Sequence, residues 1–320
     1  MVEPFSPSHI QESSTMSHHQ PPASPPDTKV VLKDLHFPEG ARRGPDGALY
    51  ISDVYAFEIL RIDPHTYEHT SIASVPNQPS GLGWLPDGRM LIVSMRDLKL
   101  LRLEPSGEVV EHADLSSIAV GAINDMFVDD DGRAWVGDFG FDYYGLLERE
   151  PDADPLFGPD ANPPSGHVTR IDPDGSVHDA APDMRFPNGI VAVDEHTLVV
   201  AETLGFRLTA FTIGADGTLT DRRVWADLAT AAPGGGPISP DGLALGPEGT
   251  VWVADPGNAG AHCVEQGGRV RQHVQASQAC FSVLEFEGSV LCCTAETSNS
   301  NYATAHATGL IESTAVALAP

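Results

Sequence analysis

Four side chains with oxygen donors, Glu39, Asn124, Asn188 and Asp241, each stand eight residues before the end of a turn that an apolar strand follows. Carboxylate and amide oxygens suit a hard divalent cation, with Ca²⁺ the first candidate and Mg²⁺, Mn²⁺ or Zn²⁺ behind it. An Asn or Asp directly before a glycine, as at positions 188 and 241, also makes ordinary turns. Four donors at equivalent positions of one repeat nevertheless favour a shared metal site.

The pattern that carries these donors occurs six times, each time as a short segment, a turn such as PDG or PEG, and a strand such as LYIS or VWVA. Alternation of apolar and polar residues indicates half-buried β-strands. Successive copies begin 41, 44, 64, 53 and 39 residues apart. A period of about 40 residues with four strands per unit predicts an all-β fold, a six-bladed β-propeller with four antiparallel strands per blade. The copies begin at Glu39, Ser80, Asn124, Asn188, Asp241 and Cys280.

The last copy is one strand short, and segments at the two ends of the repeat region can complete its blade. Residues 309–318 (GLIESTAVAL) are expected to form its third strand and residues 29–35 (KVVLKDL) its fourth, which closes the ring and removes exposed sheet edges. We therefore expect one propeller domain over residues 29–320. The Pro, Ser and His content of residues 1–28 predicts a disordered tail. A solenoid or a two-sheet sandwich is the alternative architecture.

The innermost strand of a propeller blade lines the central channel, so the six opening residues are expected to form a ring at one mouth. Cys280 could then face this mouth together with the oxygen donors. The second strand of each blade runs back and ends at the same mouth, where it mostly carries an acid. From this second layer we expect Asp138 and Glu202 to support the ligand residues. The second strands end at Asp53, Ser94, Asp138, Glu202, Asp255 and Glu296.

The longest insertion between repeats spans residues 138–166, and its aromatic residues predict a packed lid rather than a floppy loop. Phe141 and Tyr143 are the candidates for contact with a substrate, and the FGFDYY segment around them indicates a larger or more apolar one. Arg42, on the first inner strand, is a further candidate that could bind a substrate carboxylate. An ordinary salt bridge is the alternative for this arginine.

The chain of 320 residues has 18 basic and 45 acidic residues, which gives a formal net charge of -27. Such a field repels nucleic acid and anionic membranes, so neither is expected as a partner. No stretch approaches the ~20 apolar residues of a membrane span, and no apolar signal core is present. Four cysteines without zinc-like spacing are expected to be free thiols, which favours a cytoplasmic location. Six histidines are expected at the surface: His65, His69, His112, His178, His262 and His273.

With these residues at the mouth, the chain resembles the SMP-30/gluconolactonase family of six-bladed propellers, also called regucalcin-like, over about residues 30–320. The resemblance implies hydrolysis of a lactone ring, with Glu39, Asn188 and Asp241 holding a divalent cation and Asn124 contacting metal or substrate. Two departures argue against gluconolactone as the substrate. Ala122 stands where those enzymes often have Arg, and GARR follows Glu39 where an aromatic residue is common. The motifs that carry the resemblance are Glu39, Asn124-Asp125, FPNG (186–189), SPDG (239–242) and strands such as LVVAETLGFRLTAF.

The implied chemistry suits these residues. A bound cation would polarise the lactone carbonyl and stabilise the oxyanion. Asp241 is expected to be both ligand and general base toward the attacking water, and Asn124 to orient the substrate or its oxyanion. The expected partner is a small-molecule lactone or ester, bound by a monomer or small homo-oligomer. The alternatives are a non-hydrolytic biosynthetic propeller, similar to strictosidine synthases or a cyclase, and a non-catalytic calcium-binding propeller.

Overall fold

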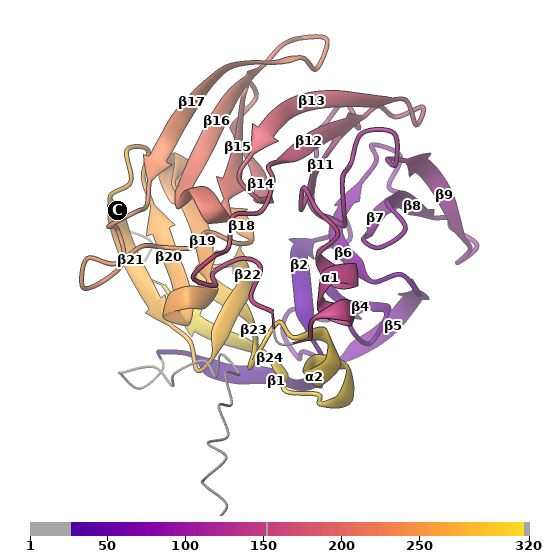
Figure 1. Cartoon of the computed structure of the whole chain (residues 1–320). Helices are drawn as coiled ribbons and strands as arrows, with labels where there is room; N and C mark the ends of the chain where they lie inside the picture. Colours follow the sequence, from indigo (N-terminus) through magenta and orange to yellow (C-terminus); the bar gives the residue numbers. More distant parts are fainter. Residues whose placement is uncertain (1–26, 152, 317–320) are drawn as a thin grey trace, which may run out of the picture.

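The computed structural model describes residues 27–151 and 153–316, which form six four-stranded antiparallel sheets arranged as blades around a central channel (Figure 1). This confirms the predicted six-bladed β-propeller. The predicted disordered tail lies outside the described residues, apart from its last two positions.

The first three blades each consist of four consecutive strands, which run from the channel outward. Blade 1 contains β2 (Pro38–Arg43), β3 (Leu49–Asp53), β4 (Glu58–Ile62) and β5 (His69–Ser74). Blade 2 contains β6 (Pro79–Trp84), β7 (Met90–Ser94), β8 (Lys99–Leu103) and β9 (Val109–Asp114). Blade 3 contains β10 (Ile123–Val128), β11 (Ala134–Asp138), β12 (Gly166–Ile171) and β13 (Val177–Met184).

The last three blades continue this order until the ring closes. Blade 4 contains β14 (Pro187–Asp194), β15 (Thr197–Glu202), β16 (Arg207–Ile213) and β17 (Leu219–Asp227). Blade 5 contains β18 (Leu243–Leu245), β19 (Val251–Asp255), β20 (Gly260–Val264) and β21 (Val270–Gln275). Blade 6 contains β22 (Ala279–Phe286), β23 (Ser289–Ala295), β24 (Gly309–Ala315) and β1 (Lys29–Leu35).

Strand β1 closes the ring, as predicted, by pairing antiparallel with β24, with Lys29 opposite Ser313. A buried carboxylate, Glu312 on β24, reinforces the closure. It accepts hydrogen bonds from the Oγ1 of Thr28, from the backbone N–H and Oγ of Ser277, and from the Oγ1 of Thr294 at 2.9 Å. One side chain thus joins the segment before β1, the segment before β22, and β23.

In the described part of the chain, two helices and three single 3₁₀ turns lie outside the sheets. α1 (Tyr143–Arg149) belongs to the insertion of blade 3, and α2 (Ser300–Ala305) connects β23 to β24. In Figure 1 both helices lie at the face of the ring that is turned toward the viewer. None of the helices within the described part of the chain is long and apolar enough to cross a membrane. The 3₁₀ turns are η1 (Thr203–Gly205), η2 (Pro247–Gly249) and η3 (Pro256–Asn258).

The core lies between neighbouring blades, because the apolar side chains of each sheet pack against the next sheet. Tyr50 and Ile59 of blade 1, for example, pack in one cluster with Leu82 and Ile92 of blade 2. Around the channel, each inner strand contacts the inner strands of both adjacent blades. This packing brings the starts of all six inner strands together at one mouth.

Glycine after the opening residue permits this close approach. A Cβ on Gly81 would lie 2.4 Å from the backbone nitrogen of Met126, and one on Gly189 would lie 2.4 Å from that of Leu243. Both distances are far below ordinary carbon–nitrogen contact, so the backbones of adjacent blades meet where only glycine fits.

Candidate functional site

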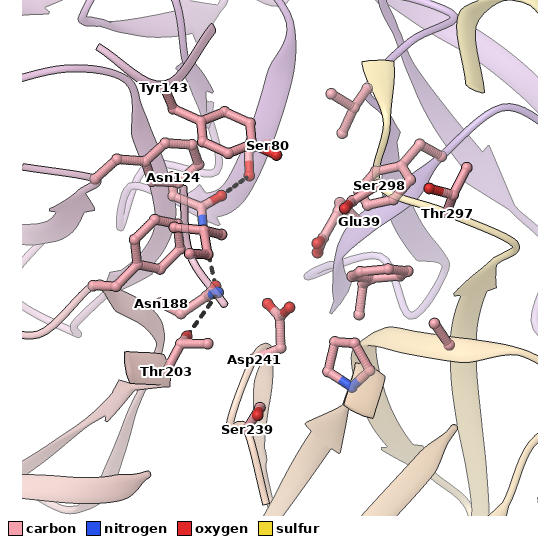
Figure 2. Close-up of a pocket in the computed structure, with 18 of the residues that line it drawn as sticks. Glu39, Ser80, Asn124, Tyr143, Asn188, Thr203, Ser239, Asp241, Thr297 and Ser298 are labelled. Atoms are coloured by element: carbon pink, nitrogen blue, oxygen red, sulfur yellow. Dashed lines mark hydrogen bonds between the residues drawn. The ribbon is translucent and has the colours of Figure 1, made fainter. Parts of the chain in front are cut away.

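A cavity of about 330 Å³ opens at this mouth, and five of the six opening residues line it (Figure 2). Each comes from a different blade and each is buried. The repeat symmetry therefore predicts correctly that these five side chains meet, although they are up to 202 positions apart in the chain (39 to 241). The residues are Glu39, Ser80, Asn124, Asn188 and Asp241.

Cys280, the sixth opening residue, does not face the cavity. Its side chain is fully buried among apolar neighbours, and its Sγ contacts the carbonyl of Ser282 at 3.5 Å. Ala279 and Phe281 line the cavity in its place. Burial raises the pKa of the Cys280 thiol well above its usual range, which disfavours the nucleophilic thiolate.

A chain of hydrogen bonds holds the amides in the floor of the cavity. The Oγ of Ser80 donates to the Oδ1 of Asn124 at 2.9 Å, and the Nδ2 of Asn124 donates to the Oδ1 of Asn188 at 2.9 Å. The Nδ2 of Asn188 donates to the Oγ1 of Thr203 at 3.3 Å, and Thr203 donates to the carbonyl of Pro240 at 2.7 Å. These bonds fix the orientation of both amides. Figure 2 shows the chain running along one side of the cavity.

The carboxylates of Glu39 and Asp241 point into the same space from different blades (Figure 2). Burial raises the pKa of Glu39 well above its usual range, and the negative charges of Asp241 and Asp125 raise it further. Burial likewise raises the pKa of Asp241, and the charge of Asp125 adds to the effect. Uncompensated negative charge of this kind is the environment that a cation relieves.

Asp125 is a buried acid near this site that the sequence analysis named only as part of a family motif and gave no role. It is 1% exposed, and neither carboxylate oxygen has a hydrogen-bond partner within the described part of the chain. Burial raises its pKa, and the positive charge of Arg42 opposes that shift. The repeat contains a signal for it, because four of the six copies have glycine directly after the opening residue and this copy has an acid.

Of the three side chains predicted to contact a substrate from the insertion and the first inner strand, one lines the cavity. Tyr143, the first residue of α1, lines the cavity, whereas Phe141 and Arg42 are not among the lining residues. Phe141 packs edge-on against Tyr143 with ring centroids 6.1 Å apart. Arg42 donates to the carbonyls of Ala41 at 2.9 Å and Met126 at 2.8 Å. Asp142 caps α1 by accepting from the N–H of Gly145 at 3.0 Å, so the insertion contains an ordered helix.

The second layer of acids anchors the loops at the mouth. Asp138 accepts hydrogen bonds from the N–H groups of Gly140 at 2.7 Å and His167 at 3.0 Å. Burial raises the pKa of Asp138 to about 6. Glu202 is buried too, but hydrogen bonds from Arg207 and Thr209 outweigh that effect and lower its pKa. Neither acid lines the cavity, so their predicted role of supporting the ligand residues stays a prediction.

The donor set fits a hard divalent cation. Among residues 27–151 and 153–316, no group of three His, Cys, Asp or Glu side chains could hold a metal ion, so a cation here would require amide or water oxygens as well. Glu39 and Asp241 supply two carboxylates, and the Oδ1 of Asn188 keeps a second lone pair beyond its bond to Asn124. Oxygen-only sets of this kind suit Ca²⁺ or Mg²⁺ better than Zn²⁺.

Solved structures share the fold over nearly the whole chain. A luciferin-regenerating enzyme superposes with a TM-score of 0.71 at 16% identity, covering 92% of this chain and 96% of that one. A calcium-binding protein, regucalcin, from Agrobacterium tumefaciens gives 0.69 at 19% identity, covering 90% and 93%. A gluconolactonase from Xanthomonas campestris gives 0.67 at 19% identity, covering 97% and 98%.

Sequence comparison adds a relative and a family. Lactonase drp35 from Staphylococcus epidermidis is 28% identical over 199 residues, which are 60% of this chain and 55% of that protein. The chain therefore spans about half the length of the curated relatives it matches. The family model described as SMP-30/Gluconolactonase/LRE-like region matches residues 37–294, from the residue before β2 to the second-to-last residue of β23. The chain belongs to the SMP-30/gluconolactonase/LRE-like family.

Proposed function

We propose that this protein hydrolyses a lactone at the mouth of the propeller with the help of a divalent cation. The observation that carries the proposal is the convergence of Glu39, Asn124, Asn188 and Asp241 on one buried cavity. A relative at 28% identity is named a lactonase, which supports the same class of reaction.

Glu39, Asn188 and Asp241 would hold the cation, with Ca²⁺ as the first candidate. When bound there, it would polarise the lactone carbonyl and stabilise negative charge on its oxygen. Asn124, whose amide is fixed between Ser80 and Asn188, would orient the carbonyl or its oxyanion.

In the reaction, Asp241 takes a proton from water while the water oxygen bonds to the carbonyl carbon. The bond between the carbonyl carbon and the ring oxygen then breaks. The proton passes from Asp241 to the departing alkoxide, and the product is a hydroxy acid. The water adds one oxygen and two hydrogens, so the step needs no other reactant.

Asp241→Asn tests the base, because the amide cannot take the proton. We expect kcat/KM on a lactone to fall by about 100-fold or more while the circular dichroism spectrum is kept. Asp194→Asn, which changes an exposed acid at the end of β14, is the control and should retain the wild-type rate. Wild-type activity should disappear on chelation and return when Ca²⁺ or Mg²⁺ is added.

Two results would count against the proposal. Wild-type turnover by Asp241→Asn would show that another group activates the water. Tight Ca²⁺ binding without turnover of any lactone would instead favour a calcium-binding propeller without catalysis.

A further inference from the structure

The walls above the polar floor of the cavity are aromatic on two opposite sides. Phe37 and Phe281, from blades 1 and 6, have ring centroids 4.7 Å apart. Phe139 and Phe186, from blades 3 and 4, stack at 4.5 Å with an interplanar angle of 19°. In a ring of six blades, these two pairs face each other across the channel. Tyr143 extends the second wall by packing edge-on against Phe139 at 5.6 Å.

The polar groups of the floor are already engaged with one another. The hydroxyls of Ser80 and Thr203 and one N–H each of Asn124 and Asn188 donate within the chain that ends on the carbonyl of Pro240. The hydroxyl of Tyr55 donates to the carbonyl of Ser298 at 3.1 Å. Beyond the floor, Ser239, Thr297 and Ser298 are the lining residues with hydroxyls on short side chains, so a lactone with several hydroxyl groups would set most of them against aromatic and aliphatic faces, which is unfavourable for buried polar groups.

The charges in the cavity are of one sign. The described residues that line it include Glu39, Asp241 and Glu296, and no Lys, Arg or His. A cation at the floor would offset the first two carboxylates, but nothing in the walls would pair with an anionic substituent on a substrate. The walls thus select against both polyhydroxylated and negatively charged lactones.

We infer that the site takes an uncharged lactone with a sizeable hydrocarbon part, which packs between the two aromatic walls while the ester group lies over Glu39 and Asp241. This inference rests on the proposed hydrolysis and specifies its substrate class. A volume of about 330 Å³ is within the ordinary range for small-molecule sites. Offset and edge-on contacts with aromatic rings favour a phenyl or branched aliphatic substituent.

Three six-membered lactones test the inference: δ-valerolactone, a δ-valerolactone that carries a phenyl group away from the ester, and glucono-δ-lactone. Each kcat/KM is divided by the rate of hydroxide hydrolysis of the same lactone to remove intrinsic reactivity. We expect the phenyl compound to exceed the unsubstituted lactone by about tenfold or more, and glucono-δ-lactone to be the poorest. A preference for glucono-δ-lactone would overturn the inference and leave the proposed hydrolysis standing.

If none of the three lactones is turned over, which would count against the hydrolysis, a binding measurement still tests the substrate class. Calorimetry then compares the corresponding lactams, in which N–H replaces the ring oxygen. The phenyl lactam should bind about tenfold more tightly than the unsubstituted one, a difference of about 1.4 kcal/mol. Equal affinity would overturn the inference about the substrate class.

Tyr143→Ser tests whether the wall that contains Tyr143 produces the preference for the phenyl lactone. It should lower the ratio of kcat/KM for the phenyl lactone over δ-valerolactone by about tenfold, because the ring loses an aromatic neighbour. Phe127→Ser removes another half-buried aromatic side chain of blade 3 that lies outside the cavity, so it should leave this ratio unchanged. An unchanged ratio in Tyr143→Ser would contradict the assignment of this wall.

Discussion

Acidic side chains at the mouth have two different environments. Glu39, Asp125 and Asp241 are buried near the cavity, and burial raises the pKa of each. The charge of Asp125 further raises the pKa values of Glu39 and Asp241. Asp53 and Asp138, one residue layer outward, each accept hydrogen bonds from two backbone N–H groups. The first group has negative charge left over for a cation or a reacting molecule. The second group accepts backbone hydrogen bonds that hold the walls in place.

Asp138 allows a test of this division by pH. Its pKa is raised from 3.8 to about 6, so the folded protein keeps the proton to higher pH than the unfolded chain does. Its contribution to stability is therefore full below pH 3.8 and is lost as the pH rises through about 6. We expect the loss of unfolding free energy in Asp138→Asn, measured with urea, to be about 2 kcal/mol larger at pH 4 than at pH 7. The same loss at both pH values would show that Asp138 ionises normally.

At the scale of single residues, the sequence predicts well which positions carry oxygen donors and poorly which way a side chain points. Glu39, Asn124, Asn188 and Asp241 were predictable because repeat symmetry fixes where equivalent positions meet. Cys280 obeys the same spacing, but its side chain is buried in an apolar cluster outside the cavity. The inner strands of blades 1 to 4 have register shifts at the same place as β22, so the shift does not account for this direction.

His262 illustrates the same limit. It was expected at the surface, yet it is fully buried and its Nε2 lies 2.9 Å from the carboxylate of Asp255. Its strand, β20, is the third of blade 5 and is buried along its whole length. The burial of a third strand depends on how far its neighbours extend, which one sequence does not reveal.

Among the elements, the inner strands set the geometry of the site through their spacing. The N–H of Gly189 on β14 donates to the carbonyl of Asp241 at 3.2 Å, so blades 4 and 5 are joined at the candidate base itself.

The strands and the closing β1 were predictable from period-two alternation and the count of strands. The helix α1 was foreseen only as a packed lid, because a helix of 7 residues has too little periodicity to recognise.

Gly189→Ala should disturb this junction. The new Cβ would lie 2.5 Å from the carbonyl oxygen of Asp241, so β14 and the segment before β18 must separate. We expect a loss of about 1–3 kcal/mol in unfolding free energy. We also expect kcat/KM to fall more than about tenfold, because Asp241 moves relative to Asn188.

Gly236→Ala provides the matched control for this element. Nothing lies within 4 Å of its added Cβ, so its unfolding free energy should stay within about 0.5 kcal/mol of wild type. If Gly189→Ala behaved like Gly236→Ala in both assays, the glycine would not be what sets the spacing of the two blades.

For the whole molecule, closure depends on one buried side chain as well as on the pairing of β1 with β24. Glu312→Ala leaves buried groups of Ser277 and Thr294 without their acceptor, which should cost about 3 kcal/mol of unfolding free energy. Hydrogen exchange should accelerate in β1 before it does in blades 2 to 4. Glu195→Ala, at an exposed turn of blade 4, is the control. Uniform acceleration around the ring would show that Glu312 does not act on closure.

The closure also constrains the time at which the fold can form. Lys29 pairs with Ser313, so the partner of the first strand is synthesised 284 residues later (313 minus 29). At translation rates of ~5–20 residues per second, this interval is on the order of 15–60 s. During it, β1 has no partner strand and one face of the most recently completed blade is uncovered. Nascent chains stalled before β24 should therefore bind chaperones, and the cavity at the mouth can be complete only after synthesis has passed the last blade.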